Sequence, residues 1–138
     1  MAAPTDTFDF PRTGKKARNR AVVAAMTNKQ SNEDGTLSDE EINWLIRRAE
    51  GGFGIVTTAA THVVPEGQGW DGEMGVWGDH QLPGLNRLAS GINEHGAISL
   101  AQIFHGGMRC PQRLTGVQPV SASINSTSDS DNGETRAL

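Results

Sequence analysis

The chain has 138 residues, 36% of them hydrophobic, and a formal net charge of −4 at pH 7. This mild acidity argues against nucleic-acid binding, because the basic residues gather only in the short stretch 12–20 and leave no broad basic face. The single cysteine, Cys110, excludes an internal disulfide. No apolar run approaches the roughly 20 residues of a membrane span, and the first residues lack the apolar core of a signal peptide. We therefore expect a cytoplasmic protein without a membrane partner.

The chain is expected to begin with an irregular lead-in that runs into a strand. Residues 1–18 carry Pro4, Pro11 and Gly14 without any apolar periodicity, which favours irregular backbone. Residues 20–26 then form a short apolar run. This run predicts the first strand.

The first helix is marked at both ends. Ser38 followed three residues later by Glu41 is a capping-box pattern, which predicts a helix start, and Gly51-Gly52 predicts the end. One apolar stripe at helical spacing lies between them. Its members are Ile42, Leu45, Ile46 and Ala49.

A second strand, a long loop, a second helix and a third strand follow. The apolar run at 53–58 predicts the second strand, and the loop after it, from Val64 to Gly78, is rich in glycine. Long loops at the carboxyl end of parallel strands often carry function. Gly96 closes the second helix and residues 98–104 form the third strand. The helix shows the stripe Leu85, Leu88, Ala89 and Ile92.

This β-α-β-α-β order predicts an α/β fold with parallel strands. Three parallel strands leave two unpaired edges and an uncovered inner face, so we expect the sheet to be incomplete on its own. The last segment, 119–138, is dense in Ser, Asn and Asp, and we expect a polar, flexible tail there. The structured part is therefore expected over 19–118.

The sequence offers no pattern for metal binding or covalent catalysis. Its four histidines have no His or Cys companion at ligand spacing, and Cys110 has no base beside it. Three small or polar residues, Thr27, Ala60 and Gln102, instead fall at the carboxyl ends of the predicted strands. Small residues let a flat ring approach the backbone, while a hydroxyl and a carboxamide hydrogen-bond its polar edge. The alternative is a set of ordinary strand-end residues without a ligand.

A family resemblance favours the ligand site. From about Arg18 to Ser123 the chain resembles the opening third of the old yellow enzyme family of FMN-dependent ene-reductases. The resemblance implies the first three β/α units of a TIM (β/α)8 barrel, with five units absent. The motifs that carry it are 19–27 (NRAVVAAMT), Asp34-Gly35, Arg47-Arg48-Ala49, Gly51-Gly52, Ala60-Thr61, 64–67 (VPEG), Asp79, Gly84-Leu85, Gln102 and His105-Gly106-Gly107.

The resemblance also implies which residues contact the cofactor. Thr27 is expected to hydrogen-bond near the reactive nitrogen of FMN and so tune its reduction potential, while Gln102 holds the pyrimidine edge. Phe104 stands where the family often has a tryptophan near the substrate. The residues expected to bind FMN are Ala24, Ala25, Thr27, Ala60 and Gln102.

The implied activity is hydride transfer from NADH or NADPH through FMN to an activated alkene such as an enone. The family's substrate-binding His or Asn pair and its tyrosine proton donor lie in later strands, so the chain is expected to need a complementary carboxyl-terminal polypeptide. Two alternatives stay open. In the first, the chain is an inactive subunit that oligomerises through its strand edges. In the second, the same barrel acts on a dienoyl-CoA or an amine as substrate.

Overall fold

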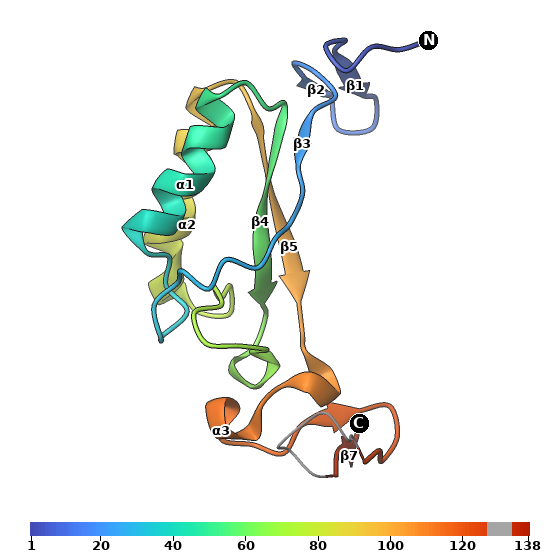
Figure 1. Ribbon diagram of the computed structural model, residues 1–138, viewed down its shortest axis with the longest axis vertical. Helices are drawn as coiled ribbons and strands as arrows, with labels where there is room; N and C mark the ends of the chain where they lie inside the picture. Colours follow the sequence, from blue (N-terminus) through green and yellow to red (C-terminus); the bar gives the residue numbers. More distant parts are fainter. Residues whose placement is uncertain (127–133) are drawn as a thin grey trace.

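A three-stranded parallel sheet forms the centre of the computed structural model, which describes residues 1–126 and 134–138 (Figure 1). Its strands are β3 (Val22–Val23), β4 (Ile55–His62) and β5 (Ile98–Phe104), in the order β3-β4-β5. Val22 pairs with Ile55, and Ile55 pairs with Ile98, so all three strands start at one level. The β-α-β-α-β prediction is confirmed.

Two helices, α1 (Asp39–Glu50) and α2 (Leu82–Glu94), cover one face of this sheet (Figure 1). The start of α1 is half of the expected capping box: the Glu41 N–H donates to Ser38 Oγ at 3.1 Å. The Glu41 carboxylate turns away from the cap and accepts from Asn28 Nδ2 at 2.8 Å and from the Ser31 hydroxyl. The Glu41 carboxylate therefore holds the loop between β3 and α1 against the helix.

The hydrophobic core lies between the sheet and the two helices, where the predicted helical stripes meet the strands. Gly91 on α2 gives α1 room to approach, since an added Cβ would lie 2.3 Å from Ile46 Cδ1. The buried core residues are Val23, Leu37, Ile42, Leu45, Ala49, Val56, Met74, Leu88, Ile92 and Ala97.

Arg18 joins the carboxyl ends of both helices at the amino-terminal end of the sheet. Its guanidinium donates to the His95 carbonyl at 2.7 Å, to the Phe53 carbonyl at 2.9 and 3.2 Å, and to the Ala49 carbonyl. The last carbonyls of a helix have no partner within that helix, so one planar side chain satisfies groups from three separate segments.

The opposite face and the outer edge of the sheet are uncovered within the described residues. Leu100 and Ile103 on β5 are 52% and 73% exposed, and among the described strands β5 pairs with β4 alone. Over residues 1–126 and 134–138 the strands form no closed barrel. The expectation of an incomplete sheet therefore holds for the part of the chain that the structure describes.

The expectation of an irregular lead-in over 1–18 is wrong. Strands β1 (Phe8–Phe10) and β2 (Lys15–Ala17) form an antiparallel hairpin, and Phe8 pairs with Ala17. Pro11 and Gly14 lie in the connecting turn, where Gly14 has φ 67°, so these residues end the strands without preventing their pairing. The hairpin is set by residues that meet across a turn, which helical or strand periodicity does not reveal.

The tail also contains regular structure where we expected none. Strand β6 (Val120–Ser121) pairs in parallel with β7 (Arg136–Ala137), and Thr135 is buried, with its hydroxyl accepting from the Asn125 N–H at 2.9 Å. The tail is therefore not irregular at these residues, while its flexibility and the boundary at 118/119 stay predictions. Residues 127–133 of the tail lie outside the described residues.

The remaining elements are short. They are the 3-10 turns η1 (Pro65–Gly67), η2 (Asp79–Gln81) and η3 (Gly107–Arg109) and the helix α3 (Gln112–Thr115). None of the described helices has both the length and the apolar character that a membrane crossing requires.

Candidate functional site

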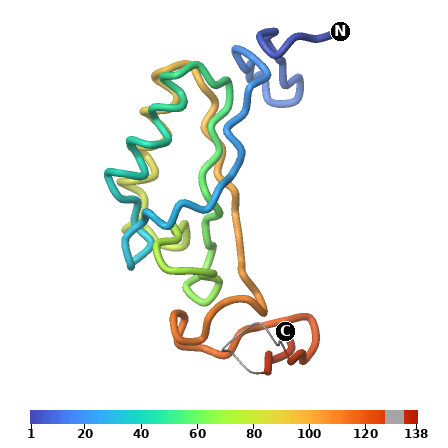
Figure 2. Tube along the Cα trace, in the orientation of Figure 1, coloured from blue at the N-terminus to red at the C-terminus, as the bar shows by residue number. Residues whose placement is uncertain are grey.

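The carboxyl ends of β3, β4 and β5 point to the same end of the molecule, and the loops that leave them lie there together (Figure 2). A β-bulge in β4 sets the register at this end. Thr57 pairs with Leu100, but Ala60 pairs with Gln102, so β4 carries one extra residue. The Thr58 hydroxyl accepts from the Gln102 N–H at 3.1 Å and donates to the Ala59 carbonyl at 2.7 Å. The bulge therefore brings Ala60 beside Gln102.

The five residues expected to bind FMN divide into two groups. Ala60 is buried and pairs across the sheet with Gln102, whose side chain is exposed. Ala24, Ala25 and Thr27 follow the last residue of β3, in backbone without regular secondary structure. The strand is thus shorter than the predicted 20–26, and the structure shows no hydrogen bond between Thr27 and either Ala60 or Gln102 within its described residues.

The residues at this edge fit a flat, polar-edged ring. The Thr27 hydroxyl and the Gln102 carboxamide are exposed and have no hydrogen-bond partner among the described residues. Ala24 and Ala60 contribute only methyl groups at the strand ends. One donor-acceptor hydroxyl, one carboxamide and small side chains are what the dioxopyrimidine edge and the face of a flavin need.

The long loop after β4 returns and pairs with the end of its own strand. The His62 N–H donates to the Met74 carbonyl at 3.0 Å, and the Val76 N–H donates to the His62 carbonyl at 2.9 Å. The same loop contacts the loop after β3, because the Gly75 N–H donates to the Gly35 carbonyl at 2.9 Å. The backbone of one loop thus links the ends of two strands.

The loop also contacts the end of β5. The Val63 N–H donates to the Phe104 carbonyl at 3.2 Å, and the Gly106 N–H donates to the Gly67 carbonyl at 2.9 Å. The Trp70 and Phe104 rings pack with centroids 5.3 Å apart. Phe104, the expected substrate-pocket residue, therefore lies half-buried against Trp70 at the junction of two strand ends.

A buried polar cluster that the sequence analysis did not identify lies beneath this loop. His62 and Glu73 are 2% and 1% exposed, and His62 Nδ1 lies 3.9 Å from Glu73 Oε2. Trp77 Nε1–H donates to His62 Nε2 at 3.0 Å, so the proton of a neutral His62 sits on Nδ1, toward the carboxyl. Nothing in the spacing of these residues predicts the cluster, because the loop that joins them has no periodicity.

Burial shifts both pKa values in the cluster toward the neutral forms. Desolvation raises the pKa of Glu73 to about 7, against the opposing effect of hydrogen bonds from the Gly69 and Trp70 backbone. Desolvation likewise lowers the pKa of His62 below its usual value, partly offset by its backbone hydrogen bond with Met74. A neutral pair is what a desolvated site favours.

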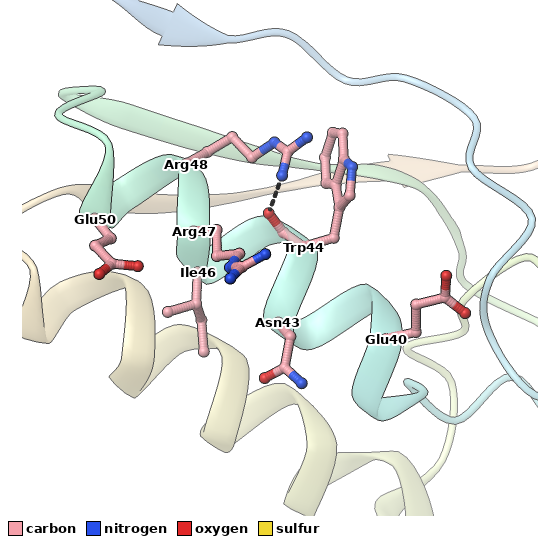
Figure 3. A pocket seen from close by; sticks show the side chains of 7 residues that line it. All are labelled: Glu40, Asn43, Trp44, Ile46, Arg47, Arg48 and Glu50. Carbon is pink, nitrogen blue, oxygen red and sulfur yellow. Dashed lines mark hydrogen bonds between the residues drawn. The ribbon is translucent and has the colours of Figure 1, made fainter.

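A separate hollow of about 570 Å³ lies along α1 and contains none of the expected site residues (Figure 3). Arg48 stacks over the Trp44 ring at 3.5 Å and donates to the Trp44 carbonyl at 2.9 Å. A single helix builds the hollow, away from the strand ends. It is lined by Glu40, Asn43, Trp44, Ile46, Arg47, Arg48 and Glu50.

Comparison with known proteins agrees with the resemblance. Residues 12–137 match the NADH:flavin oxidoreductase / NADH oxidase family. The chain is 41% identical over 113 residues to the probable NADH-dependent flavin oxidoreductase YqiG of Bacillus subtilis (strain 168), which covers 82% of this chain and 30% of YqiG. It is 36% identical over 124 residues to the NADH:acrylate oxidoreductase of Vibrio harveyi, covering 89% of this chain and 12% of that protein.

The fold matches that of a solved relative as well. The structure of the old yellow enzyme homologue from Zymomonas mobilis superposes with a TM-score of 0.88 at 25% identity, covering 99% of this chain and 40% of that one. The chain thus spans less than half the length of each of these three relatives. Its parallel sheet and covering helices correspond to the first β/α units of their TIM barrel, as the resemblance implied.

Proposed function

The chain belongs to the NADH:flavin oxidoreductase / NADH oxidase family, and from this premise we propose that it supplies the amino-terminal part of an FMN-dependent barrel that reduces activated alkenes. The observation that carries the proposal is the carboxyl end of the sheet, where the buried Ala60 pairs with the exposed Gln102 and the exposed Thr27 follows β3. In barrels of parallel strands this end holds the active site.

Each residue at this edge has a distinct task toward the flavin. The Gln102 carboxamide accepts from and donates to the pyrimidine edge, and the Thr27 hydroxyl donates near the reactive nitrogen. The methyl group of Ala60 and the backbone around Ala24 and Ala25 leave room for the ring. Hydrogen bonds that strengthen as negative charge develops stabilise the reduced cofactor and thereby set its potential.

The names of the relatives support the proposed reductant and substrate class. When bound, FMN would supply the two-electron chemistry that couples NADH or NADPH to the reduction of an activated alkene. The printed name of the Vibrio harveyi relative contains acrylate, an alkene conjugated to a carboxylate. We propose an enone-type alkene as the substrate of this protein, and the cytoplasm as its location.

A complementary polypeptide completes the barrel in this proposal. The uncovered sheet face and the exposed Leu100 and Ile103 on β5 support it, since bare strand edges need a pairing partner. The further strands would also supply the proton donor and the substrate-orienting residues. We expect the 138 residues alone to be inactive.

The test is flavin binding by the assembled protein. The chain is co-expressed with a polypeptide that carries the remaining five β/α units, purified through a tag on one part, and titrated with FMN by fluorescence quenching. We expect co-purification and a bound yellow flavin. Gln102→Ala should weaken FMN binding about tenfold, the worth of one lost hydrogen bond to a partly buried ligand.

Asn43→Ala is the matched control, because Asn43 is an exposed carboxamide on α1 that is remote from the strand ends. It should leave FMN binding unchanged. Light scattering separates the main rival: a defined homo-oligomer of this chain without affinity for FMN would support an assembly subunit and contradict the proposal.

A further inference from the structure

We propose that Glu73 is a positioning residue for the substrate side of the candidate site: its buried carboxyl holds the backbone of Gly69 and Trp70 against Phe104. The inference rests on the proposed function, because only that function makes this part of the site a place for substrate. The contacts of Glu73 are a property of the described chain, so the contacts and the function are tested separately.

The Glu73 carboxyl and the Phe104 ring contact the turn at Gly69 from two sides. Glu73 Oε2 accepts from the Gly69 N–H at 2.6 Å. A Cβ added at Gly69 would lie 3.1 Å from Phe104 Cε1 and 3.6 Å from Glu73 Oε2. The first distance is tight and the second is an ordinary contact, so the turn packs directly against the Phe104 ring while the carboxyl holds it by the hydrogen bond.

The turn carries Trp70, which forms an aromatic pair with Phe104. Gln68 strengthens the same turn, because its Nε2 donates to the Trp70 carbonyl at 3.2 Å. The position of the Trp70 ring therefore depends on backbone that Glu73 holds. The Glu73 carboxyl would therefore act on a substrate through Trp70 and Phe104, without itself contacting the reacting atoms.

The cost of burying Glu73 indicates that its polar contacts matter. A carboxyl excluded from water is destabilising unless hydrogen bonds replace the lost hydration, and an apolar residue of similar size would avoid that cost. Its Oε1 atom has no partner among the described residues, and the neighbouring titratable groups are His62 and Cys110. The raised pKa of Glu73, about 7, agrees with this environment.

Amide hydrogen exchange in the assembled protein tests the positioning. Glu73→Ala removes the acceptor, so the Gly69 and Trp70 amides should exchange about tenfold faster, while the amides of β4 stay protected. Glu73→Gln keeps an acceptor oxygen and should restore most of the protection. Glu66→Gln, the same change at an exposed glutamate of this loop, is the control and should have no effect.

The pH dependence provides a second readout, because it depends on the ionisation of Glu73 itself. Opening of the turn hydrates Glu73 and restores its usual pKa, so opening becomes easier as pH rises toward 7. After correction for intrinsic rates, exchange at Gly69 should accelerate about tenfold or more between pH 5 and pH 7. In Glu73→Gln this acceleration should be absent.

Three results would overturn the inference: unchanged exchange in Glu73→Ala, a pH profile that survives in Glu73→Gln, or the same effects in Glu66→Gln. If the Ala variant fails to fold, the pH profile of the Gln variant still decides. In FMN-loaded protein, Glu73→Ala should also weaken cyclohex-2-enone binding about tenfold while FMN affinity stays unchanged. Failure to bind FMN at all would contradict the proposed function and leave the exchange results to decide the role of Glu73.

Discussion

The backbone N–H of Gln102 donates to the Thr58 hydroxyl, 3.1 Å away and on the neighbouring strand. The bond occurs where β4 contains one residue more than β5, so a side chain replaces a ladder bond that the bulge removes. It sets the level at which Ala60 and Gln102 lie side by side.

We expect Thr58→Val to lower the free energy of unfolding by about 1–3 kcal/mol, because the partly buried Gln102 N–H loses its acceptor. Urea denaturation of the assembled protein measures the change. Thr57→Val is the control, since the Thr57 side chain is buried on the same strand and has no hydrogen bond among the described residues. Equal losses in the two variants would contradict the role of the bulge.

Stability should depend on pH through Glu73. Its pKa is about 7 in the folded protein and near 4.3 when unfolded, so the folded state binds more protons over that range. The resulting stabilisation is complete below about pH 4.3 and is lost as pH rises through 7, a change on the order of 3 kcal/mol.

Comparison of wild type with Glu73→Gln isolates this effect. The stability of the wild type relative to the variant should decrease between pH 4.5 and pH 7.5, and calorimetry at several pH values measures it. His62 acts in the opposite direction, because its lowered pKa makes its contribution present above about pH 6.5 and lost on acidification. A constant difference between the two proteins would contradict the buried environment of Glu73.

Gly72→Ala should be more destabilising than Gly14→Ala. Both glycines have positive φ, 74° and 67°, so each substitution introduces backbone strain of about 1 kcal/mol. A Cβ at Gly72 would also lie 2.7 Å from the Lys29 carbonyl oxygen, whereas Gly14 has no atom within 4 Å. We expect a further loss of about 1–3 kcal/mol at Gly72, measured by denaturant unfolding. Equal losses in the two variants would contradict the close packing of the Gly72 loop against the Lys29 backbone.

Arg18→Lys should lower the free energy of unfolding by about 2–3 kcal/mol, because an ammonium group does not reproduce the planar set of donors that reaches three segments. Thermal unfolding measures the loss. Arg12→Lys, the same change at an exposed arginine, is the control and should stay within about 0.5 kcal/mol of wild type. A wild-type melting temperature for Arg18→Lys would contradict the proposed role.

Local sequence patterns were sufficient to predict the central helices and strands. The stripes around Leu45 and Leu88 and the cap at Ser38 depend on residues three or four apart, and the structure confirms both helices between the three parallel strands. The bulge at Thr58 and the links of Arg18 are different. They join residues dozens of positions apart, so no window of sequence contains them.

The candidate site shows the same division. The structure pairs Ala60 with Gln102 at the strand ends. The role of every expected site residue toward a ligand stays a prediction, for Ala60 and Gln102 as well as for Thr27, Ala24, Ala25 and Phe104. Glu73 was missed because a buried carboxyl in a glycine-rich loop looks like any solvated loop residue until the backbone donors around it are known. Its burial follows from tertiary contacts alone.

Arg18 lies at the amino-terminal end of the strands, opposite the edge that carries Gln102. The Arg18 contacts and the proposed flavin site therefore lie at opposite ends of the sheet. We expect that side chains around Gln102 can be varied while Arg18 still holds the helix ends, and that added stability near Arg18 would let such variants tolerate mutations that weaken the fold.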